Sequence, residues 1–152
     1  MSLTITNSMP TSFKQELMTA THNFSNPGGN TFKIALFVGT ATGTGTYNAT
    51  TTNYSDMSSN ELPDATGGYS RPGKTLTSVT PTTSGTTAYT DFDDVTWSSA
   101  TFTTSGALIY NSSASGAACA VLSFGGDQTV SSGDFTVQFP AAAASTAIIR
   151  IA

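Results

Sequence analysis

The sequence predicts an all-β protein: an antiparallel β-sandwich, jelly-roll-like, with one short N-terminal helix. Hydrophobic residues make up 38% of the 152 residues and include nine Phe, five Tyr and one Trp, a composition typical of a folded chain. One segment near the N-terminus has a helical period, and most later segments are short, rich in strand-forming residues and separated by Gly- and Ser-rich breaks. We therefore expect a single β-sandwich domain over residues 1–152.

The expected helix covers residues 11–23. Apolar residues recur there at positions i, i+4, i+7 and i+11, namely Phe13, Leu17, Ala20 and Phe24. Ser12 and Gln15 have the spacing of a capping box. The breakers of residues 26–30 end the segment.

The expected strands begin with residues 32–38, where apolar residues alternate so that one face is fully apolar. Residues 39–73 have little pattern and predict a long irregular loop segment, with at most one edge strand near residues 46–52. Further strands are expected at residues 74–80, 87–97, 100–103, 107–111, 118–124, 134–139 and 147–151. The turns between them fall at residues 82–85, 104–106, 112–116, 125–127 and 131–133.

The charge and cysteine content exclude several classes of protein. Charged residues make up only 9% of the chain and the net charge is −4, so no basic patch is available to bind nucleic acid. A single Cys119 permits neither an internal disulfide nor a multi-cysteine zinc site, and its apolar surroundings predict a buried thiol. Residues 1–10 lack the pattern of a signal peptide, and no apolar stretch is long enough to span a membrane.

Few residues could carry catalysis. His22 is the only imidazole, and a nucleophilic site would need it near a serine or Cys119; at the end of the expected helix it is better explained as a capping or surface residue. No Gly-x-Ser-x-Gly sequence occurs. Glu16 and Glu61 are the only glutamates, and nothing in the sequence pairs them for glycosidase chemistry. We expect no enzyme activity, no cofactor and no metal ion.

Three further groups of residues have two interpretations each. Asp91, Asp93 and Asp94 could hold calcium, or they could form a solvated strand edge that resists aggregation. The glycine-rich segment 67–74 lacks phosphate-loop spacing and predicts an irregular loop from which Tyr69 and Arg71 project, either as plain loop residues or as contacts with a partner. The third group could be a carbohydrate-stacking platform or core aromatics: Tyr89, Phe92, Trp97, Phe102 and Tyr110.

Motifs along nearly the whole chain resemble those of small virion proteins of tailed bacteriophages. They are Ser12–Leu17, Thr31–Leu36, Asn60-Glu61-Leu62, Gly68-Tyr69, Gly73–Leu76, Trp97–Thr101, Gly106–Asn111 and Phe124–Val137. The chain departs from the group by inserting residues 63–66 before the Gly-Tyr pair. The resemblance implies a capsid decoration or cement protein, of a type that is often a trimer with a β-sandwich or jelly-roll core.

From this resemblance we expect a virion protein on the capsid surface, assembled in the host cytoplasm. Its partners would be the major capsid protein and further copies of itself, with a homotrimer favoured; nucleic acid and membranes are not expected partners. The alternative is a tail-associated or carbohydrate-binding β-module for host attachment, with Trp97 or Tyr69 as a stacking platform. The candidate interface lies in the loop segment 39–73 and consists of Tyr47, Tyr54, Met57, Leu62, Tyr69 and Arg71.

Overall fold

A computed structural model describes residues 2–152 and shows a mainly β protein, with 48% strand and 12% helix. One antiparallel sheet has the strand order β4-β2-β7-β8, a second has the order β5-β6-β9, and β1 and β3 form a short parallel pair. The strands are β1 (Thr4–Ile5), β2 (Phe32–Val38), β3 (Thr46–Tyr47), β4 (Lys74–Thr75), β5 (Ser78–Ser84), β6 (Thr87–Phe92), β7 (Val95–Asn111), β8 (Ala117–Val137) and β9 (Ile149–Ile151). The described strands close no barrel, and a jelly-roll order is not shown.

Strand β2 lies at the centre of the larger sheet and was predicted with the correct bounds. It pairs antiparallel with β4 on one side and with β7 on the other. Every residue of β2 except Lys33 is buried, so both faces of the strand are covered. A nearly continuous apolar run is the pattern of such a doubly covered strand, whereas an alternating pattern belongs to a strand with one solvated face.

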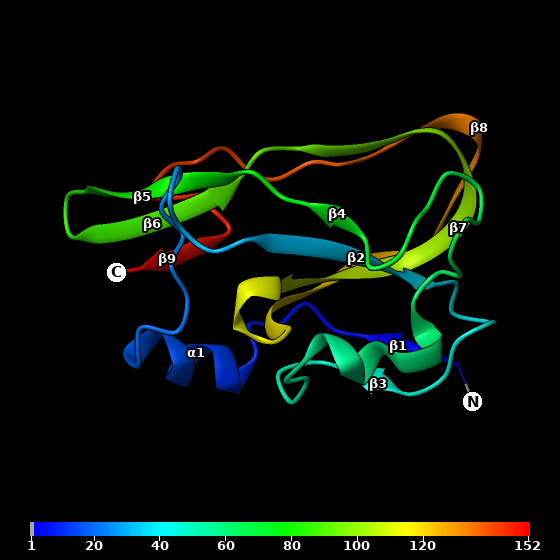
Figure 1. Ribbon diagram of the computed structural model, residues 1–152, viewed down its shortest axis with the longest axis horizontal. Coiled ribbons are helices and arrows are strands. Elements are labelled where there is room, and N and C mark those ends of the chain that lie inside the picture. Colours follow the sequence, from blue (N-terminus) through cyan, green and yellow to red (C-terminus); the bar gives the residue numbers. More distant parts are fainter. Residues whose placement is uncertain (1) are drawn as a thin grey trace.

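Strands β7 and β8 form one long hairpin that bends back over the sheet. Its pairing runs from Asn111 opposite Ala117 at the closed end to Val95 opposite Val137 at the open end, with a register shift between Thr104 and Gly106. Figure 1 shows the hairpin curling there, so that its open half returns above β2. We call residues 106–111 and 117–123 the inner half, and residues 95–103 and 129–137 the outer half.

The expected turns at residues 104–106, 125–127 and 131–133 are therefore wrong. These residues lie within continuous strands and mark irregular points of the ladder or the bend. Gly106 is needed because a Cβ there would lie 2.3 Å from the carbonyl oxygen of Leu122. The turn at residues 112–116 is confirmed. The expected turn at residues 82–85 is wrong for residues 82–84, which belong to β5, and the chain reverses at Gly85 and Thr86. The same bend merges four of the expected strands into two.

Residues 61–76 fill the space between the outer half of the hairpin and β2. Tyr69 joins the two layers, because its hydroxyl accepts from the Leu36 amide and its ring centroid lies 6.2 Å from that of Trp97. Two glycines with positive φ permit the close approach. A Cβ on Gly67 would lie 1.7 Å from the Thr101 oxygen, and one on Gly73 would lie 2.0 Å from the Ile34 oxygen.

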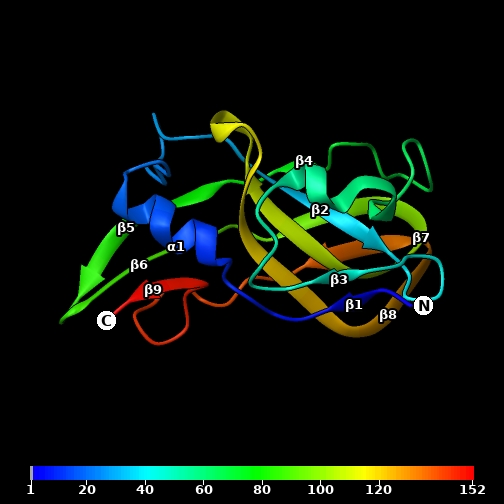
Figure 2. The ribbon, with the colours of Figure 1, turned by 90° about the horizontal axis from the view of Figure 1, so that it is seen from below.

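The opposite face of the sheet is covered by helix α1 (Thr11–Met18), the 3-10 segment η1 (Tyr54–Asn60) and the β1–β3 pair, as Figures 1 and 2 show. Helix α1 is shorter than the expected 11–23 because Ala20 adopts φ +58, which the right-handed helix does not allow. The expected capping box is also wrong: Pro10 is the N-cap, and the buried Ser12 hydroxyl has no partner.

The loop segment 39–73 is irregular, as expected, but it belongs to the core. It contains β3, two residues long instead of the expected 46–52, and η1, which starts from a capping box of Asn53 and Asp56. Its apolar residues have no period because the two-residue β3, short turns and a 3-10 segment, and not one long strand, carry them into the interior. A further short helical turn, η2 (Ser112–Ala114), joins β7 to β8. Strand β9 lies within the expected strand 147–151 and pairs antiparallel with β6.

Candidate functional site

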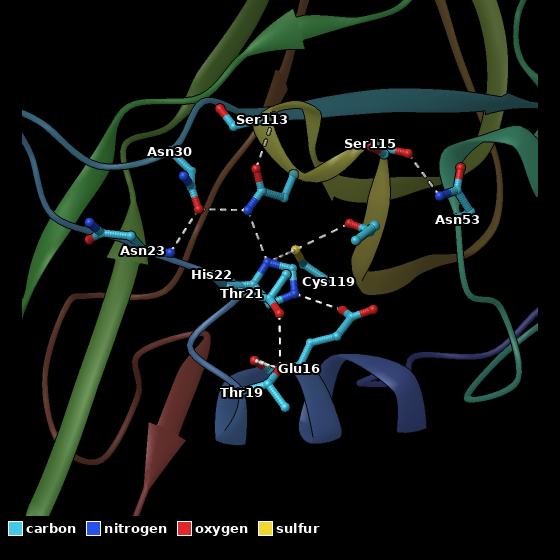
Figure 3. Close-up of polar contacts among 12 residues, drawn as sticks. Glu16, Thr19, Thr21, His22, Asn23, Asn30, Asn53, Ser113, Ser115 and Cys119 are labelled. Carbon is cyan, nitrogen blue, oxygen red and sulfur yellow. Dashed lines mark hydrogen bonds and ion pairs between the residues drawn. The ribbon is translucent and has the colours of Figure 1, made fainter.

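The single histidine lies in a buried polar cluster, which we call the His22 cluster and which Figure 3 shows. Helix α1 supplies Glu16, β7 ends in Asn111, and β8 supplies Cys119. His22 Nε2 lies 2.7 Å from Glu16 Oε2, while Nδ1 lies 3.0 Å from Asn111 Nδ2 and 3.8 Å from Cys119 Sγ. The His22 side chain is fully buried. The expectation that it is a surface or capping residue is therefore wrong.

The hydrogen-bond network assigns the tautomer of His22. Asn111 Oδ1 accepts from the Ser113 amide and its Nδ2 donates to Asn30 Oδ1, so the amide cannot be reversed without losing both bonds. Asn111 Nδ2 therefore also donates to His22 Nδ1, and His22 Nε2–H donates to Glu16. The ring packs 4.8 Å from that of Phe13. The cluster joins α1, the segment after it and the closed end of the hairpin.

The contacts run from Glu16 to His22 to Cys119, which is the arrangement of an orienting acid, a base and a nucleophile in a catalytic triad. Burial decides against catalysis in this conformation, because Cys119 is 0% exposed and no substrate atom can reach its sulfur. Burial also raises the pKa of the thiol well above its ordinary value, and the carboxylate of Glu16 raises it further. The thiol is thus kept protonated, and the predicted burial of Cys119 is confirmed.

A second buried cluster, the Glu61 cluster, forms around the other glutamate. The carboxylate of Glu61 accepts from the Tyr54 hydroxyl at 2.5 Å and from the Tyr69 hydroxyl at 2.7 Å. Arg71 Nε lies 3.5 Å from Glu61 Oε2, and its guanidinium also donates to the backbone oxygens of Glu61 and Leu62. Burial, and then the hydrogen bond to Glu61, raise the pKa of Tyr54 and Tyr69. The cluster ties residues 54–71 together.

The candidate interface residues are mostly in the wrong place for an interface. Tyr47, Met57, Leu62 and Tyr69 are buried within the chain, so their side chains present no surface to a partner. Tyr54 is half-buried, and Arg71 keeps an exposed side while its guanidinium binds the backbone. The error has a physical cause: apolar residues without a regular period can be buried by irregular backbone as well as by a partner.

The three aspartates do not converge. Asp91 is 1% exposed and accepts from the amides of Phe92 and Ile148, and burial raises the pKa of its carboxyl. Asp94 accepts from the Phe139 amide, and Asp93 is exposed. A solvated strand edge is thus wrong for Asp91. Within residues 2–152, no group of three or more His, Cys, Asp or Glu is arranged to hold a metal ion.

The aromatic residues of the strands form core. Phe92, Trp97, Phe102 and Tyr110 are buried, and Tyr89 is half-buried. A carbohydrate-stacking platform on Trp97 or Tyr69 is therefore wrong, because neither ring has an exposed face. The sequence did not predict either cluster: the members of the His22 cluster come from distant segments, and those of the Glu61 cluster lie within residues 54–71 but have no regular spacing.

The outer half of the hairpin presents a hydroxyl-rich surface on one face. Cross-strand threonines bond to each other, Thr96 to Thr136 at 2.8 Å and Thr103 to Thr129 at 2.9 Å. Its exposed residues include Ser98, Ser99, Thr101, Thr129, Ser131, Ser132 and Thr136. Asp134 is its only charged residue. Beyond Ser123, the second edge of β8 has no strand partner among the described residues.

No helix in the described part of the chain is long and apolar enough to cross a membrane. Comparison of the chain with family models, with curated proteins and with solved structures finds no significant match. Function must therefore be inferred from the residues of the chain and from the motifs described above.

Proposed function

We propose that this chain is a bacteriophage virion structural protein, a capsid decoration or cement protein that binds and stabilises the head lattice. Its partner is the major capsid protein, and its place is the capsid surface, after assembly in the host cytoplasm. The motif resemblance supports the virion assignment. Among the structural observations, the hydroxyl-rich surface on the outer half of the hairpin supports the proposal most directly.

The outer half suits adhesion to a protein lattice. Its strands are cross-bonded through backbone and threonine hydroxyls, so little conformational freedom is lost when it binds. With Asp134 as its only charge, it would bind through shape, hydroxyls and backbone groups, with little dependence on salt. His22, Cys119 and Glu61, the side chains of the two clusters best suited to base, nucleophile and acid chemistry, are instead buried, which supports a role without catalysis.

The fold and assembly of the proposed protein follow the same resemblance. The mainly β, antiparallel architecture supports a β-sandwich, jelly-roll-like core of the kind found in decoration proteins. We propose a homotrimer, because decoration sites commonly lie on threefold axes and closed symmetry buries exposed strand edges. The unpaired part of β8 supplies such an edge.

Copy number per virion tests this function most cheaply. Quantitative mass spectrometry of purified particles should find hundreds of copies, since a decoration protein covers the head lattice. A dozen copies or fewer would place the chain in the tail, which is the alternative assignment. Absence of the chain from purified particles would overturn the virion assignment altogether.

A further inference from the structure

A hollow of about 370 Å³ lies between β2, the start of η1 and the turn from β7 to β8. Its walls include Lys33, Tyr54, Ser55, Pro72, Tyr110 and Ser115. The volume falls at the small end of the range for ligand sites in proteins. The hollow lies outside the proposed capsid-binding half of the hairpin, and neither buried cluster uses its free polar groups.

Two tyrosines form its rigid wall. The ring of Tyr54 stacks on that of Tyr110, with centroids 4.5 Å apart and planes at 21°. The hydroxyl of Tyr54 is held by Glu61, and that of Tyr110 donates to the backbone oxygen of Pro72 at 2.6 Å. Tyr54 is half-buried, so part of its ring remains available. A ring held at its hydroxyl and on one face is preorganised to pack against a ligand.

The hollow also carries free polar groups, and Lys33 is the direct cross-strand partner of Tyr110. Lys33 is the only residue of β2 that is not buried, and its ammonium group forms no ion pair or hydrogen bond within residues 2–152. The hydroxyls of Ser55 and Ser115 also lack protein partners in the same residues. Asn53 fixes both sides of the hollow, since its side chain accepts from the Ser55 amide and donates to the Ser115 oxygen.

The charges around the hollow favour a negative ligand group beside Lys33. Two carboxylates bond to residues of its wall, and both are engaged: Glu61 by two tyrosine hydroxyls and Arg71, and Asp56 by the amides of Thr52 and Asn53. Two other cationic side chains, by contrast, already bond to backbone oxygens. Lys74 donates to the Thr96 oxygen, and Arg150 donates to the Ala144 oxygen. Lys33 is therefore a cation beside an aromatic ring and two hydroxyls.

We propose that this hollow binds an acidic saccharide. The C–H face of a pyranose ring packs against the available part of Tyr54, Lys33 receives the carboxylate, and the hydroxyls of Ser55 and Ser115 bond to the sugar hydroxyls. Aromatic packing combined with a few directed polar groups is what such a ligand requires. The site goes beyond the proposed capsid function and does not depend on it.

Titration of the purified full chain with D-glucuronic acid, followed by NMR of the backbone amides, tests the site. We expect shifts confined to residues 53–55 and 112–116, and weak binding in the millimolar range. Methyl glucoside, which lacks the carboxylate, should bind about fivefold more weakly, because one exposed charge pair contributes about 1 kcal/mol. Inorganic phosphate should not reproduce the pattern of shifts.

Three variants separate the contacts. Lys33→Met should remove the preference for glucuronic acid over methyl glucoside, while the matched exposed-lysine variant Lys14→Met leaves it unchanged. Tyr54→Ala should weaken binding of both sugars by about tenfold, whereas Tyr54→Phe keeps the ring and should retain binding. Because the Lys33 side chain is not buried, we expect Lys33→Met to fold. This variant therefore tests the site even if Tyr54→Ala does not fold.

Several results would overturn the saccharide site. Shifts spread over the whole chain, or none with 20 mM sugar, would remove it, since about 20 mM exceeds the expected dissociation constant. Equal shifts with phosphate would reduce it to a simple anion contact. A preference for glucuronic acid that survives Lys33→Met would show that Lys33 does not receive the carboxylate. None of these results bears on the copy number in the virion.

Discussion

The two halves of the β7–β8 hairpin have the same backbone pairing and opposite surroundings. In the inner half, Ile109 and Val121 are fully buried because the sheet is covered on both sides. In the outer half, Thr129 and Thr136 are exposed and their partners across the ladder are also threonines. The outer half is two-sided, because Trp97 and Phe102 are buried in the core while the threonines face outward. The inner half therefore contributes to folding alone, and the outer half contributes its buried side chains to folding and its exposed hydroxyls to the proposed binding.

The segment 61–76, packed between the outer half and β2, should be the most sensitive place. Gly73 has φ +87, and a Cβ there would lie 2.0 Å from the Ile34 oxygen, so Gly73→Ala must displace backbone. We expect a loss of more than about 3 kcal/mol in the free energy of unfolding, or no folded protein. Gly85→Ala is the matched control, because Gly85 also has a positive φ but nothing within 4 Å. Urea unfolding followed by circular dichroism measures both.

Equal losses in the two glycine variants would show that φ alone, and not the packing of residues 61–76 against β2, determines the cost. The segment would then be less firmly held than the structure indicates.

The two halves can also be compared directly. Ile109→Ala removes a fully buried side chain of the inner half, and we expect it to cost about 3 kcal/mol of unfolding free energy. Thr129→Ala removes one exposed hydroxyl of the outer half and should cost about 0.5 kcal/mol or less. Chemical unfolding of the two variants gives the values. Similar costs would contradict the division of the hairpin into core and surface.

Alkaline pH should destabilise the protein through its buried tyrosines. Burial raises the pKa of Tyr54, Tyr69 and Tyr110 above the value of about 10 expected in the unfolded chain. Their contribution to stability is therefore fully present below pH about 10 and is lost as the pH rises further towards the folded pKa. Absorbance at 295 nm and circular dichroism should change together for these three residues. Tyr54→Phe should release one proton fewer on alkaline unfolding.

Ionisation of all tyrosines while the β-sheet spectrum stays intact would contradict the buried Glu61 cluster, because a phenolate cannot donate to a buried carboxylate.

Sequence patterns predicted the parts of the fold that local structure determines. Strand β2 and the turn at residues 112–116 follow from hydrophobic runs and turn residues, and both are confirmed. Gly106, Gly125 and Gly126 predicted turns but lie within bent strands. A glycine permits either outcome, and the choice depends on a ladder partner far along the chain.

The candidate site was less accessible to prediction. Glu16, His22, Asn111 and Cys119 meet only because helix α1 packs against the closed end of the hairpin, which no spacing in the sequence encodes. Tyr47 and Met57 lacked a period and were therefore assigned to an interface, although irregular backbone buries them. The partners and the function are therefore proposals, supported by the motifs and by the exposed surface of the outer half.

Under the proposed function, the outer half binds the capsid through a surface whose only charge is Asp134. Purified protein should be added to capsids of its phage that lack it, and binding measured by cosedimentation. Thr129→Lys combined with Thr136→Lys should keep the wild-type unfolding free energy within about 0.5 kcal/mol and weaken binding by at least about tenfold, since two unpaired charges would be desolvated. Thr86→Lys, in the exposed β5–β6 turn, should bind like wild type. A double variant that binds as tightly as wild type would contradict the claim.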